Sequence, residues 1–315
     1  MRRNLLLIFM VLIMVLQTGC WNYIEISDRD IVVGVAVDYN PLEDKLIQTV
    51  EIAAPQMLEG QTQIKAKVLE STGENFFDAA RNIVGITGKK LFWSHTKTLV
   101  LGNSAVMNED IFMTTLDFIK RDAEPRDNIW VVLAKDAEAR DILTETNVEI
   151  QDIVSMFIDE TFKNQESVSK YAGVQLFELI DNLEEVGISP VIPTVQLREE
   201  NDSILCEIQG LAVFKGNELM GYLNGDETLY FLMATDQLKG GIIVVEHKFH
   251  SKDTRVSLEI YKNKTKVKPS IVDDKLRIEI DIQTDVEISE ISDETDVISD
   301  KNRELLEEIA CKKIQ

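Results

Sequence analysis

Cys20 is the first residue whose surroundings predict a specific chemical event. It follows Arg2, Arg3, an unbroken run of twelve apolar residues from Leu5 to Leu16, and then Gln17-Thr18-Gly19. A charged start, a short apolar run and small residues before a cut site are typical of a secretory signal peptide. Twelve apolar residues are too few to span a bilayer, which takes about 20. We therefore predict a lipoprotein signal peptide over residues 1–19, removed so that the Cys20 thiol can carry a diacylglyceryl group.

Anchoring through Cys20 follows from the free energy of burying acyl chains. Each buried methylene contributes about 0.8 kcal/mol, and a single chain holds a protein only marginally. The two or three chains of a lipidated cysteine therefore give a stable attachment. Two alternatives remain, namely secretion with a free Cys20 and an uncleaved anchor. Gln17 stands where such sites usually carry Leu, which bears on how efficiently the site is processed.

The remaining sequence lacks a recognisable catalytic or metal-binding set. For the three histidines, His95, His247 and His250, we expect a structural role for the first and a solvated pair for the other two. The run from Gly85 to Lys89 has two residues between its glycines, whereas a Walker A motif needs four. The G-x-S-x-G motif of serine hydrolases does not occur. The sequence therefore predicts a protein that is not an enzyme and that uses no metal and no cofactor apart from the lipid on Cys20.

The densest charge pattern is the segment Arg121-Asp122-Ala123-Glu124-Pro125-Arg126, near the expected end of a helix. One interpretation is local ion pairing and helix capping, since exposed ion pairs contribute little stability. The other interpretation is a contact with another protein subunit, for which Arg121, Asp122 and Arg126 are the candidate residues. The sequence leaves both open.

The charge of the chain excludes several classes of partner. Residues 20–315 carry 31 basic and 55 acidic residues, a net charge of −24. This balance argues against nucleic acid, because no basic patch is available to displace counterions from phosphates. It also argues against adhesion to anionic lipid head groups, so the lipid must supply the attachment. Cys206 and Cys311 lack the close spacing of a zinc or redox site; we expect Cys206 to be a small buried hydrophobe, and a disulfide between the two is the less favoured alternative.

Apolar periodicity predicts an α+β fold of mixed sheets with packed helices. Short β-branched or alternating runs predict strands, and apolar residues at helical spacing predict helices. In the first part of the mature chain the two types alternate, as in an α/β-type domain. Strands are predicted at 31–37, 50–54, 64–68, 98–101 and 129–133, and helices at 76–84, 111–119, 150–162 and 174–183. A capping box of Ser71 and Glu74 is expected before the first of these helices.

The polar run from Arg198 to Ser203, which follows two prolines, is interpreted as a linker. We therefore expect an N-terminal domain over residues 20–200 and a β-rich C-terminal domain over residues 201–315. In the second, strands are predicted at 205–214, 219–223, 242–246, 256–261, 276–282 and 286–291.

Two helices are predicted in the C-terminal domain. We expect a helix at 226–233, capped by Asp226, and an amphipathic helix at 302–314. Gly210 is expected to form a bulge in its strand. Because the chain stops inside the last helix with no strand to cover its apolar face, the C-terminal domain is expected to be truncated.

Four segments, in this order, resemble the Ger(x)C family, the C subunits of spore germinant receptors of endospore-forming bacteria. The resemblance covers essentially the whole mature chain. It rests on Gly19-Cys20-Trp21-Asn22 with Ile31 to Asp38, on Trp93-Ser94-His95-Thr96-Lys97, on Phe118 to Arg126, which is similar to the family's R-D-x-E-x-R segment, and on Gly210 to Lys215 with Leu219, Gly221 and Leu223.

The resemblance implies a non-catalytic lipoprotein subunit on the outer face of the inner spore membrane. Members of the family associate with an A-type subunit and a transporter-like B-type subunit, and together these respond to nutrients and start germination. The alternative function is a solute-binding lipoprotein that delivers a small molecule to a membrane transporter. That alternative calls for a cleft between two similar domains, and the two halves of this sequence differ in pattern.

Overall fold

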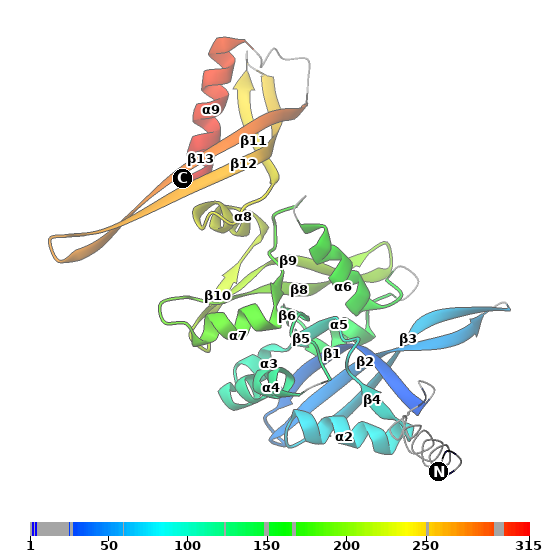
Figure 1. The fold of residues 1–315 in the computed structure, drawn as a ribbon. Helices are drawn as coiled ribbons and strands as arrows, with labels where there is room; N and C mark the ends of the chain where they lie inside the picture. The colour runs from blue at the N-terminus through cyan, green and yellow to red at the C-terminus, as the bar shows by residue number, and fades with distance from the viewer. Residues whose placement is uncertain are drawn as a thin grey trace.

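The computed structural model describes residues 28–315 apart from 59, 123, 148–150, 166–167, 250–251 and 293–298, together with positions 2, 4 and 25. Cys20 and the predicted signal peptide therefore lie outside the described residues, apart from two isolated positions. The described part is an α+β structure with two sheets (Figure 1), as the sequence predicts. None of the helices described there is both long and apolar enough to cross a membrane.

A ten-stranded mixed sheet forms the larger body of the molecule, and its main path runs β10-β9-β8-β6-β5-β1-β2-β3. The four central strands, β8, β6, β5 and β1, are parallel to one another, and antiparallel hairpins flank them on both sides. Two short strands, β4 and β7, pair with β1 and β6 outside this path. The strands are β1 (Arg29–Asn40), β2 (Lys45–Leu58), β3 (Gln61–Gly73), β4 (Lys90–Phe92), β5 (Thr98–Leu101), β6 (Trp130–Ala134), β7 (Val174–Gln175), β8 (Val191–Glu200), β9 (Ser203–Lys215) and β10 (Glu218–Leu223).

The central strands are apolar on both faces because helices cover both faces of the sheet. One core lies beneath α2 (Phe76–Thr87), α3 (Asn103–Val106), α4 (Glu109–Arg121) and α7 (Leu176–Glu184), and the other beneath α5 (Ala139–Thr144) and α6 (Val154–Lys163). Alternate residues of one strand serve the two cores, since successive side chains point to opposite faces. Val35 and Val37 enter the first core, and Ala36 enters the second. The unbroken apolar runs of the sequence follow from this double burial.

Two of the predicted helix caps are wrong. Asn75 caps α2 by accepting a hydrogen bond from the N–H of Asp78, whereas Ser71 lies in β3 and donates its hydroxyl to the carbonyl of Ala79. In α8 (Gly225–Ala234) the cap is Asn224, and Asp226 lies in the first turn. Asn is as good an N-cap as Asp or Ser, so residue type alone does not show which of several nearby polar residues caps a helix.

The predicted linker at 198–203 is also wrong. The segment is the hairpin connection between β8 and β9, with Glu200 paired to Ser203 and positive φ at Asn201 and Asp202. The large sheet therefore continues across the expected boundary at 200/201. A register shift opposite Gly210, whose φ is +89°, confirms the predicted bulge in β9.

A three-stranded antiparallel sheet forms the second body, with the order β11-β12-β13. Its strands are β11 (Gly241–Phe249), β12 (Lys252–Val272) and β13 (Lys275–Ile291). The strands predicted at 276–282 and 286–291 are therefore one strand. α8 lies between this sheet and the large one, contacting β9 and β10 on one side and β12 and β13 on the other, and the second body lies beyond it (Figure 1).

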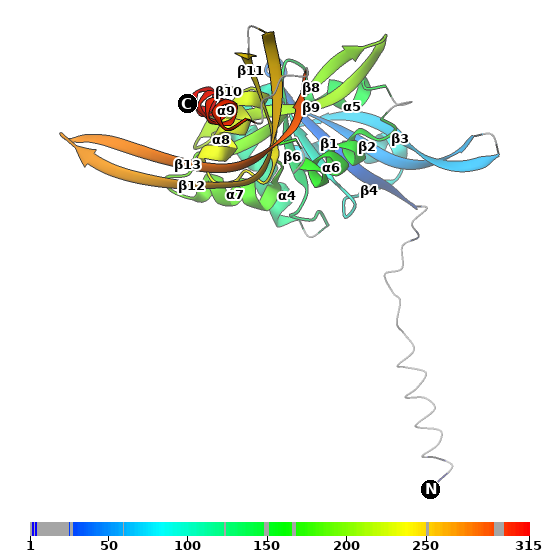
Figure 2. The same ribbon diagram turned by 90° about the horizontal axis from the view of Figure 1, so that it is seen from above.

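The final helix, α9 (Asp300–Ile314), packs on the three-stranded sheet. Leu306 is buried in the third core with Val245 and Ile260, and Lys313 donates to the carbonyl of Val244 at 2.6 Å. The expectation that this helix has no strand to cover its apolar face is therefore wrong. Beyond the helix, β12 and β13 continue as a two-stranded ribbon that projects from the body, on the side opposite the β2–β3 hairpin (Figure 2).

Candidate functional site

Two sequence segments that carry the family resemblance meet at one cavity. The hydroxyl of Ser94 donates to the carbonyl of Glu124 at 3.0 Å, which joins the turn after β4 to the turn after α4. Trp93 from the first turn and Asp122 from the second then line a cavity of about 230 Å³ beside α2. The fold therefore gathers a tryptophan and two carboxylates from segments that lie about 30 residues apart in the sequence.

Charges of both signs line this cavity. Arg29, at the start of β1, pairs with Glu124 (Nη1 to Oε1, 3.5 Å), and its guanidinium lies 5.0 Å from the ring centre of Phe92. Arg81 of α2 and Lys90 of β4 also line the cavity. Among the described residues neither has an acidic side chain within ion-pair distance.

The three predicted subunit-contact residues have different surroundings. Arg121 is on the outer surface of α4, 74% exposed, and pairs with Asp117 one helical turn earlier at 2.5 Å. Asp122 ends α4, accepts the N–H of Glu124 at 2.8 Å, and lines the cavity. Arg126 is exposed and has no ion-pair partner among the described residues. Local pairing and capping therefore account for Arg121 and Asp122 but not for Arg126.

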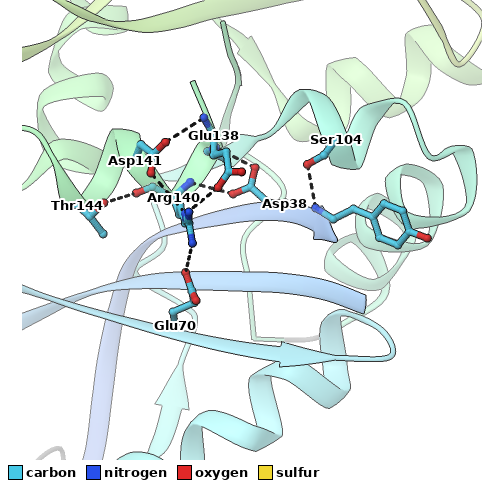
Figure 3. Close-up of polar contacts among 9 residues, drawn as sticks. Asp38, Glu70, Ser104, Glu138, Arg140, Asp141 and Thr144 are labelled. Atoms are coloured by element: carbon cyan, nitrogen blue, oxygen red, sulfur yellow. Dashed lines mark hydrogen bonds and ion pairs between the residues drawn. The ribbon is translucent and has the colours of Figure 1, made fainter. Parts of the chain in front are cut away.

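A second polar cluster lies at the carboxyl end of the parallel strands (Figure 3). Asp38, near the end of β1, is 2% exposed, and its two carboxylate oxygens accept the N–H groups of Ala139 and Arg140 at 2.9 Å. Burial raises the pKa of Asp38 to about 6, although the two backbone hydrogen bonds offset part of the effect. Arg140 in turn pairs with Glu138 (2.7 Å) and reaches Glu70 of β3 (3.7 Å).

A buried carboxylate also holds the start of α6. Glu51 of β2 is fully buried, and its oxygens accept the N–H groups of Val154 and Ser155 at 2.8 and 2.9 Å. Burial raises the pKa of this carboxyl, and the hydrogen bonds from α6 act in the opposite direction. The β1–β2 pair thus supplies the anion at the first turn of both helices on the second face of the sheet, where the helix dipole favours negative charge. Neither role was predicted from the sequence, where the available signal is an acid that lies within or near the end of an apolar strand.

The described structure places several of the groups that could take part in bond-breaking chemistry. The carboxylates of Asp38 and Glu51 are committed to backbone N–H groups, and the buried, free thiol of Cys206 has a pKa raised by burial. His95 packs its ring 5.5 Å from that of Phe92. In the described part of the chain, histidine, cysteine and acidic side chains do not gather into a group of three that could hold a metal ion. His250 lies outside the described residues.

Comparison with known proteins gives two family matches that together span most of the chain. Residues 22–197 match the spore germination protein N-terminal domain, and residues 209–315 match the spore germination B3/GerAC-like C-terminal domain. Bacillus subtilis spore germination protein B3 is 26% identical over 260 residues, which is 80% of this chain and 65% of that protein. The putative spore germination protein YfkR of the same organism is 26% identical, over 75% of this chain and 62% of that protein.

The crystal structure of the GerBC protein is similar to 89% of this chain, with 79% of that structure covered, a TM-score of 0.48 and 19% identity. The chain spans about two thirds of the length of relatives such as B3 and YfkR. The two domain matches lie in the order of the chain and leave only 198–208 between them unmatched. The chain therefore belongs to the GerAC-like family of spore germination proteins.

Proposed function

We propose that this protein is a lipid-anchored, non-catalytic subunit of a nutrient germinant receptor in an endospore-forming Gram-positive bacterium. It is held by the acylated Cys20 on the outer face of the inner spore membrane. There it assembles with an A-type subunit and a transporter-like B-type subunit and contributes to assembly or signalling of the receptor. The anchor is the covalent lipid alone, and the protein uses no other cofactor.

The observation that carries this proposal is the pair of family matches over 22–197 and 209–315. A match to both domains in one chain, with spore germination proteins as relatives, favours this role over that of any other lipoprotein. The sequence before the first match supports the anchor, because its apolar run is too short to span a bilayer and ends next to a cysteine. The acidic surface fits attachment by lipid rather than by charge.

The exposed basic residues Arg121 and Arg126 are the candidate contacts with another subunit, with Asp122 between them. Arg126 is the best supported of these candidates because it has no ion-pair partner among the described residues. Arginine is enriched at protein interfaces, where its planar group makes several hydrogen bonds at once. Replacing Arg126 with Gln should weaken co-purification with the other subunits and leave the fold unchanged.

Deletion of the gene in its sporulating host tests the proposal. The expected result is normal spores that fail to germinate in response to one class of nutrient and still germinate with other triggers. A detergent extract of spore membranes should in addition yield the two membrane subunits on purification of this chain. Unchanged responses to every nutrient, together with no co-purifying membrane subunit, would contradict the proposal.

The alternative, a solute-binding lipoprotein, finds less support in the fold. Such a protein is expected to bind its solute between two similar domains. Here one sheet has a parallel centre and the other is an antiparallel sheet of three strands. The two bodies are therefore not alike, and the receptor-subunit role is the better supported function.

A further inference from the structure

The cavity between α2, β4 and the end of α4 has the properties of a small-ligand site. Its volume of about 230 Å³ equals the space of about eight water molecules at roughly 30 Å³ each. It therefore accommodates a molecule of about that many non-hydrogen atoms. Pockets that bind small molecules combine apolar walls with a few charged groups that fix orientation, and this cavity has both.

The apolar part of the wall includes both aromatic and aliphatic side chains. The aromatic rings are those of Trp93, Phe77 and Phe118, and the aliphatic side chains are Leu91 and Val84. Phe77 is 46% exposed and Leu91 is buried. Aromatic faces also attract cations through the ring quadrupole.

Two of the charged groups in the wall form an ion pair with each other, and three others have charge or hydrogen-bonding atoms that no described residue pairs with. Arg29 and Glu124 form the ion pair. Arg81 lies with its guanidinium 4.7 Å from the ring centre of Phe77 and, like Lys90, has no acidic partner among the described residues. Asp122 uses Oδ1 to accept the N–H of Glu124, which leaves its second oxygen for another donor.

We propose that this cavity binds a small zwitterion, a molecule that carries an ammonium group and an anionic group on a compact apolar body. The anionic group lies between Arg81 and Lys90. The ammonium lies against Asp122 and the aromatic rings, and the apolar body rests on Leu91. The inference does not depend on the germination role, because it follows from the cavity alone. Two sources share the chemistry: a free amino acid with an aliphatic side chain, and the phosphoethanolamine head group of a phospholipid. The aliphatic wall favours the amino acid.

Calorimetric titration of the full chain in detergent with matched probes tests the proposal. Leucine carries both charges, 4-methylpentanoate carries only the anion, and 3-methylbutylamine carries only the cation. Leucine should bind with a Kd on the order of 1 mM or tighter, and each single-charge probe should bind at least tenfold more weakly. Titration with O-phosphoethanolamine tests the second source. If this probe binds more tightly than leucine, the ligand is a head group and the proposal of a zwitterion site still holds.

Two variants locate the site. Asp122→Asn keeps the oxygen that accepts the N–H of Glu124 and removes only the charge, so it should lower leucine affinity at least tenfold without unfolding the chain. Arg81→Gln should also lower leucine affinity at least tenfold, because it removes a positive charge that binds the anionic group of the ligand. Asp226→Asn and Arg198→Gln, which lie outside the cavity, are the controls and should leave affinity unchanged. Equal binding of leucine and the single-charge probes, failure of both zwitterions to bind, or unchanged affinity in Asp122→Asn and Arg81→Gln would overturn the proposal.

Discussion

The carboxylate of Asp38 lies directly against the α-carbon of Gly102. A β-carbon built on Gly102 would be 1.9 Å from Oδ1 of Asp38, closer than any real contact of that kind. Asp38 cannot move away freely, because the same oxygen accepts the N–H of Ala139. The buried carboxylate at the carboxyl end of β1 therefore requires a glycine at the carboxyl end of β5. Because that carboxylate binds the start of α5, the same glycine also helps to fix the position of α5.

Gly102→Ala should therefore destabilise the protein by about 1–3 kcal/mol, the usual cost of overpacking a core. Urea unfolding followed by circular dichroism measures this. Gly85→Ala is the matched control, since a β-carbon there meets no atom within 4 Å and alanine is the better helix former by about 1 kcal/mol. Equal stability of the two variants would contradict the packing argument.

The raised pKa of Asp38 predicts a pH dependence of stability with a definite sign. Its pKa is about 6 in the folded chain against 3.8 as the ordinary value, so between these values the folded state binds more protons than the unfolded state. The contribution of Asp38 to the free energy of unfolding is therefore greatest below about pH 4. It falls by about 3 kcal/mol as the pH rises through 6.

Asp38→Asn isolates that contribution from the many other acids of the chain. Asn keeps one acceptor for the start of α5 and cannot ionise, so the variant should gain stability relative to the natural chain as the pH rises from 4 to 7. Urea unfolding at a series of pH values gives the difference. Parallel curves for the two proteins would show that Asp38 titrates normally in the folded state.

Much of the fold could be predicted because double burial leaves a strong pattern. The run 31–37 and the helix at 111–119 correspond to β1 and α4 with only their ends extended. The hairpin at 198–203 could not be predicted, since such a polar run has the same composition in a linker and in a hairpin turn. What separates the two is pairing between residues on either side, which no local pattern records.

The candidate site was less predictable than the fold. The charges at Asp122 and Glu124 were visible in the sequence, but their neighbours Arg81 and Lys90 come from other elements and carry no signal of their own. Long-range packing decides which charged residues share a cavity. Likewise Asp38 and Glu51 are ordinary acids in the sequence, and only the placement of α5 and α6 gives them a role.

The continuity of the large sheet predicts that residues 20–200 do not fold alone. β9 lies after that boundary, yet its Ala212 and Phe214 belong to the main core, and the ring of Phe214 stacks on Phe112 at 5.9 Å. A chain ending at residue 200 should lack cooperative unfolding and should aggregate. A chain ending at residue 223, which includes β9 and β10, should unfold cooperatively. Cooperative unfolding of the shorter chain would show that residues 20–200 fold as an independent domain.

The proposed acylation of Cys20 predicts a membrane-bound protein even in the absence of the proposed partner subunits. Cys20→Ala, produced in a host without the other receptor subunits, should move from the membrane fraction to the soluble fraction. Cys311→Ala removes an exposed thiol elsewhere and should leave the distribution unchanged. Full retention of the Cys20 variant in the membrane fraction, or an unmodified thiol in mass spectra of the native N-terminus, would contradict the lipid anchor.

The projecting β12–β13 ribbon has one apolar face and one charged face. Val267 pairs with Ile280 and Pro269 with Ile278 across the strands, and the three aliphatic residues among them are about half exposed. The intervening positions carry opposite charges, such as Lys268 paired with Glu279. This alternation is the pattern of a sheet with one buried face, but in the described structure that face is open to solvent.

Replacing Ile278 and Ile280 with Thr should therefore increase solubility without destabilising the fold. Thr keeps a high β-propensity, and exposed substitutions usually change stability by less than about 0.5 kcal/mol. Exposed β-rich apolar segments promote aggregation, so light scattering at increasing protein concentration should fall in the double variant. Val245→Ala, at a buried position of β11, is the contrasting control and should lose about 1–3 kcal/mol. A comparable loss of stability in the ribbon variant would mean that the apolar face is covered in solution.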